Sequence, residues 1–395
     1  MLETVLFDIG LIGILIAYAV YGYRNGFLYA VAGLLGLLLG AVVAFFLVPV
    51  IANWVPDSGW RIVVVIVAGV GLMIGGHAAG VALGSLASRN LKKPSIRAVD
   101  RSLGAVVNVI AAALVLSLLG SSVAALGIPV LSRAVASSNV LRVINVITPD
   151  PVESFLAQVR STLVQDGLPA ITEALGGIVN PPVLPNFDTG SPALNAAAQS
   201  VVRITGTAAA CGQSQAGTGF VVADDRVVTN AHVVAGVREP VVETPSGQVI
   251  GGTVVYFDPI DDLAVIAVPG LNAAPLVRAD TVPDGTDGVI DGYPFGGPFV
   301  TTAAEVLSVD TARVADIYNN SQNNREVYTL ATTVNEGDSG GPFLTLDGQV
   351  AGVVFAKAAN TANVGYAMTM AELDPVADQA AAFTNPVDSG TCNRG

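Results

Sequence analysis

Four long apolar runs dominate the first 126 residues, at roughly 5–23, 27–50, 62–86 and 103–126. Each is close to the roughly 20 residues that an α-helix needs to cross the hydrocarbon core of a bilayer. None has the regular polar positions of a surface helix. We therefore expect four membrane spans, with three spans and one re-entrant segment as the alternative. The chain begins Met-Leu-Glu, without the basic start of a cleaved signal peptide.

After residue 199 the pattern changes to short β-type runs between turn residues. These runs are 201–204, 219–222, 227–229, 249–256, 263–268, 288–290, 327–331 and 350–355. Regular short strands of this kind indicate a barrel or a sandwich. We expect residues 195–395 to form an all-β domain, with a length that suits two β-barrels.

The segment between these parts, residues 127–194, mixes both patterns. Apolar residues at helical spacing predict an amphipathic helix on the outer leaflet or on the β domain; they are Val152, Phe155, Leu156, Val159 and Leu163. Residues 181–192 contain several prolines and small polar residues, which favour an extended, exposed linker. The predicted domains are thus 1–126, 127–194 and 195–395.

Small and ionisable residues interrupt the apolar runs. Glycines four residues apart favour close helix packing and occur as Gly36 and Gly40, Gly71 and Gly75, and Gly76 and Gly80. Asp8 and His77 are ionisable groups inside the spans. Such groups either mark a transport path or serve packing and hydrogen bonding, and we expect the second role.

Charge separates the two halves of the chain. Only 12% of residues are charged, against about 25% in an average soluble domain, which agrees with a part in lipid. Residues 1–194 carry 10 basic and 9 acidic side chains, whereas residues 195–395 carry 8 and 22. An acidic surface does not attract nucleic acid or anionic lipid, so neither is expected as a partner of the β domain.

Basic residues in the connections predict the orientation in the membrane. The third connection holds Arg89, Lys92, Lys93, Arg97 and Arg101, and the first holds Arg24. The positive-inside rule puts these two connections in the cytoplasm, so that both termini lie outside. The β domain is then expected on the periplasmic side of the cytoplasmic membrane.

Two cysteines, Cys211 and Cys392, lie near the two ends of the β domain. They are either two free thiols or one disulfide, and the exported location favours the disulfide. Two cysteines without a nearby histidine do not make a zinc site. Neither a metal nor a cofactor is expected.

Three motifs in the β domain carry nucleophilic chemistry. They are T-N-A-H-V-V with His232, D-D-L-A-V-I with Asp262, and G-D-S-G-G-P with Ser339. A serine hydroxyl needs a base to take its proton and a carboxylate to orient that base. Asp262 is preferred to Asp261 as the acid because it directly precedes the apolar run. The N–H groups of Gly337 and Ser339 are the candidate oxyanion donors.

The first half, with its basic third connection and R-A-V-D-R-S-L-G, resembles the CvpA family, named for colicin V production. The three motifs resemble the chymotrypsin-like clan of serine proteases, especially its HtrA-like branch. G-V-V-F-A and V-G-Y-A-M in addition look like the substrate-cleft strands of that branch. The whole chain is similar to the MarP family of mycobacterial acid-resistance membrane proteases. This resemblance implies two perpendicular six-stranded barrels with the site between them, and a disulfide in the periplasmic domain.

The same resemblance implies a membrane-anchored serine endopeptidase that cleaves envelope proteins and supports resistance to acid and oxidative stress. Thr333, six residues before Ser339, would line the primary pocket and disfavour a strict Lys/Arg preference. Asp338 has no Ile-Val-Gly-Gly N-terminus to pair with, so its role is open. Linker 176–200 is a candidate site of self-cleavage. The alternative function is a membrane scaffold or small transporter with a protease-like domain that only binds.

Overall fold

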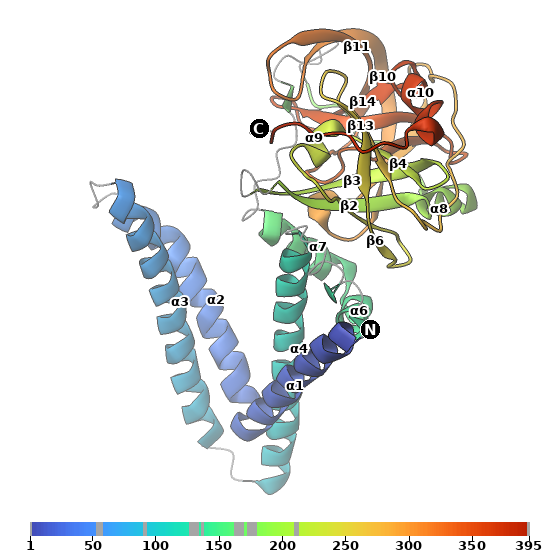
Figure 1. The fold of residues 1–395 in the computed structure, drawn as a ribbon. Helices are drawn as coiled ribbons and strands as arrows, with labels where there is room; N and C mark the ends of the chain where they lie inside the picture. Colours follow the sequence, from blue (N-terminus) through green and yellow to red (C-terminus); the bar gives the residue numbers. More distant parts are fainter. Residues whose placement is uncertain are drawn as a thin grey trace. The chain divides into compact units, whose positions relative to one another are not determined.

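Four long helices form the N-terminal part of the chain: α1 (Leu2–Asn25), α2 (Phe27–Ala52), α3 (Ser58–Arg89) and α4 (Pro94–Ala125). The computed structural model describes residues 2–52, 58–89, 93–125, 134–135, 138–161, 170–171, 180–208 and 213–392. Within these residues, four helices are long and apolar enough to cross a membrane. The predicted helical membrane part is confirmed, and Figure 1 shows its helices in blue and teal.

One boundary of this part differs from the prediction. Because α4 begins at Pro94, Arg97 and Arg101 lie on the helix instead of in the third connection. Asp100, in the same stretch, accepts a hydrogen bond from the backbone N–H of Leu28 at 3.1 Å, at the start of α2. The R-A-V-D-R-S-L-G motif thus fastens α4 to the turn between the first two helices.

Glycines allow α2 and α3 to pack closely. A side chain on Gly36 would meet the carbonyl oxygen of Gly76 at 2.2 Å, and one on Gly80 would meet that of Ala32 at 2.0 Å. Gly71 and Gly75 have no such neighbour among the described residues. The ring of His77 lies 3.0 Å from the carbonyl oxygen of Gly33, so it takes part in hydrogen bonding between these helices.

Residues Leu118–Gly395 form a second compact unit. Its helices before the β domain are α6 (Asn139–Ile147) and α7 (Asp150–Ser161). The first sheet has the order β6-β5-β2-β3-β4-β8-β7. Its strands are β2 (Val201–Ala208), β3 (Gln213–Ala223), β4 (Arg226–Thr229), β5 (Val241–Glu243), β6 (Val249–Gly251), β7 (Thr253–Asp258) and β8 (Leu263–Ala267).

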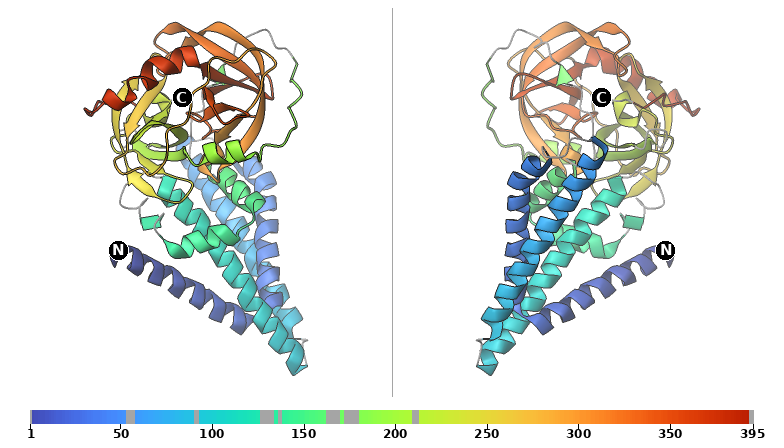
Figure 2. Two further views of the ribbon diagram at one scale, coloured as in Figure 1. Left: turned by 90° about the vertical axis from the view of Figure 1, so that its right-hand side faces the viewer. Right: turned by 90° about the vertical axis from the view of Figure 1, so that its left-hand side faces the viewer.

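The second sheet has the order β1-β13-β12-β9-β10-β11-β14, and β13 also pairs with β14, which closes a barrel. Its strands are β1 (Ala170–Ile171), β9 (Asp287–Gly292), β10 (Val300–Ala315), β11 (Gln322–Ala331), β12 (Pro342–Thr345), β13 (Val350–Ala358) and β14 (Val364–Thr369). Figure 2 shows the two sheets side by side. The predicted double-barrel fold class is confirmed, and β1 adds a seventh strand from the linker.

The barrels are filled by apolar side chains that alternate inward along the strands, as in β2, where Val202 and Ile204 are fully buried. Short helices complete the unit: α8 (Pro192–Ala198), α9 (Ala231–Val234) and α10 (Met370–Ala377), with the 3₁₀ turns η2 (Pro294–Gly296) and η3 (Ala380–Ala382). α9 follows β4 in the first barrel, and the turn between β11 and β12 belongs to the second. These two segments carry His232 and Ser339, whereas Asp262 lies in the turn between β7 and β8.

Candidate active site

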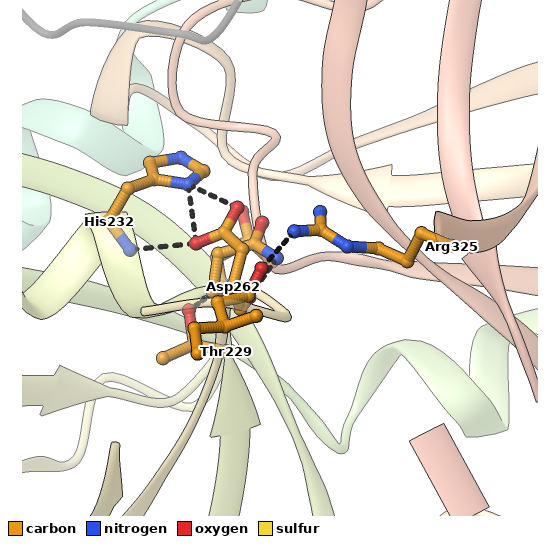
Figure 3. Close-up of polar contacts among 7 residues, drawn as sticks. Thr229, His232, Asp262 and Arg325 are labelled. Atoms are coloured by element: carbon orange, nitrogen blue, oxygen red, sulfur yellow. Dashed lines mark hydrogen bonds and ion pairs between the residues drawn. The ribbon is translucent and has the colours of Figure 1, made fainter. Parts of the chain in front are cut away.

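His232 and Asp262 lie side by side in the first barrel. Nδ1 of His232 is 2.8 Å from Oδ2 and 3.1 Å from Oδ1 of Asp262. The backbone N–H of His232 also donates to Oδ1, at 2.9 Å (Figure 3). Both residues are buried. The carboxylate therefore fixes the imidazole ring and favours a proton on Nδ1, which leaves Nε2 free to accept one.

Asp262, and not Asp261, is the carboxylate against His232. Asp262 has a left-handed φ of 57°, an uncommon conformation for a residue other than glycine, and Nδ2 of Asn230 donates to its carbonyl at 2.9 Å. The neighbouring Asp261 is only partly buried. Burial raises the pKa of Asp261, the charge of Asp258 adds to this, and that of Arg325 opposes it.

Ser339 lies in a tight turn that packs on the residues just before His232. Its carbonyl accepts from the N–H of Thr218 at 2.9 Å. Gly340 has a φ of +80°, and a Cβ there would lie 2.3 Å from Oγ1 of Thr229 and 2.9 Å from the nitrogen of Asn230. Only glycine fits this approach. Among the described residues, the buried Oγ of Ser339 has no hydrogen-bond partner, so it does not bond to His232 in this structure.

The predicted oxyanion donors are the backbone N–H groups of Gly337 and Ser339. Within the described part of the chain, the N–H groups of Gly337 and Ser339 donate no hydrogen bond. The carbonyl of Glu336 accepts from the N–H of Phe295. Because a trans peptide directs its C=O and N–H to opposite sides, the Gly337 N–H points away from Phe295. Both donors are thus available for a ligand.

A loop that the motifs did not reveal, residues 293–297, supports Gly337 from behind. A Cβ on Gly337 would lie 2.4 Å from the carbonyl oxygen of Tyr293. Nη1 of Arg203, from the first barrel, donates to the carbonyl of Gly296 at 3.0 Å. Ala157 of α7 packs so closely that a Cβ on Gly297 would be 2.6 Å from its own. The proline and glycines of Y-P-F-G-G were the only sequence signal for this loop.

Two buried carboxyl groups lie beneath the Ser339 turn. Burial raises the pKa of Asp291 to about 7, partly offset by the hydroxyl of Thr301. Burial also raises the pKa of Asp338 to about 7, partly offset by hydrogen bonds from Asn335. The N–H of Asn335 donates to Oδ2 of Asp338 at 2.8 Å. Asp338, whose role was open, therefore caps the turn that leads into Ser339.

The remaining predicted site residues are Thr333 and the two cysteines. Thr333 is exposed just after β11, and its place in a primary pocket stays a prediction. Cys392 is disulfide-bonded. Cys211 lies outside the described residues, so the pairing of the two cysteines also stays a prediction.

Comparisons with known proteins agree with this geometry. The colicin V production protein family matches residues 7–149, and the trypsin-like peptidase domain family matches residues 217–353. The serine protease Rv3671c of Mycobacterium tuberculosis is 34% identical over an alignment of 395 positions, which covers 98% of each chain. The chain belongs to the Rv3671c family of serine proteases. The predicted MarP-type resemblance is thereby confirmed.

Structures and other relatives of the Rv3671c family support the same fold. The crystal structure of the active form of the Rv3671c protease matches with a TM-score of 0.50 and 40% identity, over 56% of this chain and 100% of that one. The mitochondrial serine protease HTRA2 of Bos taurus is 38% identical over 141 residues, which are 35% of this chain and 30% of that protein. The chain is thus a multi-pass membrane protein with a trypsin-like serine protease domain.

Proposed function

We propose that Ser339 is the nucleophile, His232 the general base and Asp262 the carboxylate that orients it. The observation that carries this proposal is the buried, doubly hydrogen-bonded contact between His232 and Asp262, next to a glycine-flanked serine turn. Oγ of Ser339 would attack the substrate carbonyl while Nε2 of His232 takes its proton. The N–H groups of Gly337 and Ser339 would stabilise the resulting oxyanion.

The second half of the reaction needs no further group. His232 returns its proton to the leaving amine, and the peptide bond breaks to give an acyl ester on Ser339. A water molecule, deprotonated by the same imidazole, then hydrolyses the ester and regenerates the hydroxyl. This series of steps supports an endopeptidase that acts on proteins and peptides.

The substrates we propose are proteins of the cell envelope. The four candidate spans tether the protease domain near the membrane, and the charge of the connections supports its periplasmic side. A role in acid and oxidative stress is supported by the family resemblance. The raised pKa values of Asp291 and Asp338 further support function at acid pH, because both carboxyl groups are neutral there.

Self-cleavage of linker 176–200 is also part of the proposal. The nucleophile turn pairs with β13 through Val354, which accepts from Gly340 and donates to Gly341. Further along β13, β14 takes one edge, so the linker strand β1 takes the other, where Ala170 and Ile171 pair with Lys357 and Ala358. The strand that precedes linker 176–200 therefore runs along the same edge of β13 as the nucleophile turn.

Cleavage of casein or a fluorogenic peptide by the full-length protein tests the proposed triad. We expect Ser339→Ala and His232→Ala to lower kcat by about a million-fold and Asp262→Ala by about 10⁴-fold, each with an unchanged circular dichroism spectrum. Asp261→Ala is the matched control and should retain most of the rate. A larger loss for Asp261→Ala than for Asp262→Ala would refute the assignment of the acid.

A further inference from the structure

Arg325 is a fully buried arginine that the proposed chemistry does not use. It lies in β11 of the second barrel opposite Ala312 of β10, and only 1% of its surface is exposed. A buried arginine is costly unless its charge and its N–H groups are compensated. Its position therefore calls for a specific function.

Arg325 reaches across to the loop that carries Asp262. Its Nη2 donates to the carbonyl of Ile260, two residues before Asp262. Figure 3 shows the guanidinium on the side of Asp262 that is opposite His232. The Arg325 Cζ also lies 5.5 Å from the centre of the Phe355 ring, a cation–π contact within the second barrel.

Other bonds also hold the loop from Asp258 to Asp262, in addition to the one that Asn230 donates to the carbonyl of Asp262. Oδ1 of Asp258 accepts from the N–H groups of Ile260 and Asp261, at 2.8 and 3.1 Å. The N–H of Ile317, also from the second barrel, donates to the carbonyl of Pro259 at 3.1 Å. These bonds form a turn, but Asp262 itself is in a left-handed conformation that costs about 1–3 kcal/mol unless its surroundings enforce it.

The positive charge of Arg325 is balanced by carboxyl groups that form no ion pair with it. Among the described residues it forms no ion pair, and its electrostatic partners are Asp261 and Glu372. Oε1 of Glu372 accepts a hydrogen bond from the backbone N–H of Glu326 at 2.8 Å, and this bond fixes the glutamate. The guanidinium thus serves the Ile260 carbonyl instead of neutralising a single adjacent carboxylate.

We propose that Arg325 is a positioning residue for catalysis, which locks the Asp262 loop of the first barrel onto the second barrel that carries Ser339. The inference rests on the proposed role of Asp262. Arg325 would keep the Asp262 carboxylate directed at His232 while His232 faces a nucleophile on the other barrel. A shift of about 1 Å between such groups can cost about 100-fold in rate.

The test uses the full-length protein in detergent and three variants. Arg325→Met removes the donor at similar length, Arg325→Lys keeps a charge and a donor, and Arg313→Met, on the exposed face of β10, is the matched control. We expect Arg325→Met to lower kcat for a short peptide about 100-fold with little change in KM. Arg325→Lys should recover part of that loss, and Arg313→Met should behave as wild type.

Two further readouts separate positioning from folding. The downfield proton resonance of the His232–Asp262 hydrogen bond should weaken in Arg325→Met and return in Arg325→Lys. The pH profile of kcat/KM should shift, since the imidazole loses its oriented carboxylate. Normalising rates to the titrated active-site concentration removes the effect of unfolded protein, and Arg325→Lys serves alone if Arg325→Met does not fold.

Asp262→Ala, measured in parallel, distinguishes two kinds of failure. If Asp262→Ala retains the wild-type rate, the proposed triad is wrong. If Asp262→Ala loses activity but correctly folded Arg325→Met keeps the wild-type kcat and resonance, only the positioning role is overturned. Arg325→Met with a lower melting temperature and an unchanged rate per active site would also overturn it.

Discussion

Two buried residues with carboxyl groups, Asp291 and Asp338, contact the turn that carries the proposed nucleophile. Asp262 contacts His232, and burial raises the pKa of Asp291 and Asp338 to about 7. A Cβ on Gly341 would meet the carbonyl oxygens of Asp291 and Asp338 at 2.4 and 2.9 Å, so both residues directly underlie the serine turn. Their protonation state therefore bears on the stability of the region that holds Ser339.

The stability of the protease should fall as the pH rises from acid values through about 7. The pKa of Asp291 in the folded protein lies above the ordinary value of 3.8. Its contribution to the free energy of unfolding is therefore fully present below pH 3.8 and is lost as the pH rises through about 7. Within this range Asp291 alone should lower the free energy of unfolding by about 1.4 kcal/mol for each step of one in pH, and Asp338 adds a similar fall. Asp291→Asn should remove the part of this dependence that comes from Asp291 and leave that of Asp338, so that its melting temperature drops less than that of the wild type between pH 5 and pH 8.

Thermal unfolding in the Ser339→Ala background, which avoids self-digestion, measures this effect. Asp310→Asn, at an exposed position of β10, is the control and should follow the wild-type pH dependence. An Asp291→Asn variant whose stability changes with pH as steeply as wild type would show that Asp291 does not titrate in this range.

Local motifs explain why the residues of the site were predictable and their supports were not. His232, Asp262 and Ser339 each stand in a distinctive hexapeptide, and their order along the chain suits one known arrangement. Arg325 gave no such signal, because an arginine between asparagine and glutamate in a strand ordinarily lies on the surface. Its burial depends on a carbonyl that is 65 residues away in the sequence.

At the scale of elements, strands with clear apolar runs were predicted and those of mixed composition were missed. β10 is 16 residues long, but it has charged and small residues among its apolar ones because part of it is exposed. The linker strand β1 could not be foreseen, since two residues carry no periodicity and pair only because β13 offers a free edge. The amphipathic helix was predicted to lie either on the outer leaflet or on the β domain. The helix α7 covers most of this segment and contacts η2 of the protease.

Self-cleavage should separate the membrane part from the protease within residues 176–200. The reason is tethering, since a linker that follows a strand on the edge of β13 has an effective concentration near the site of about millimolar. Wild-type protein should accumulate a protease fragment whose N-terminus, read by mass spectrometry, lies in this range, and Ser339→Ala should stay intact. Equal processing of the two proteins would point to a different protease.

At the scale of the whole molecule, the orientation of the four spans in the membrane is predicted from the basic residues of the connections. The connection around residues 89–93 retains Arg89, Lys92 and Lys93, and Arg97 and Arg101 begin α4 close by. All five charges thus stay near one end of the third and fourth spans, so the correction to the α4 boundary leaves the positive-inside argument unchanged.

An impermeant maleimide should label the protease domain and not this basic connection in intact cells. Ser246→Cys, exposed in the first barrel, should react from outside, and Ser95→Cys, exposed at the start of α4, should react only after the membrane is permeabilised. Native cysteines contribute no signal if they are paired. Labelling of Ser95→Cys in intact cells would reverse the orientation and remove the argument for a periplasmic protease.

The predicted disulfide between Cys211 and Cys392 should support catalysis as well as stability. The C-terminal tail packs against the segment that follows the His232 helix: the N–H of Gly236 donates to the carbonyl of Ser389 at 3.0 Å, and Oγ of Ser389 donates to the carbonyl of Val237 at 2.8 Å. A bond that closes a loop of this size removes unfolded-state entropy worth about 5 kcal/mol in the chain-entropy model. Cys392→Ser, or reduction of the wild type, should therefore lower both the melting temperature and kcat, with Thr391→Ser as the control. Two free thiols in protein from native membranes, found by non-reducing mass spectrometry, would disprove the bond, whereas an intact bond whose reduction leaves kcat unchanged would limit it to a structural role.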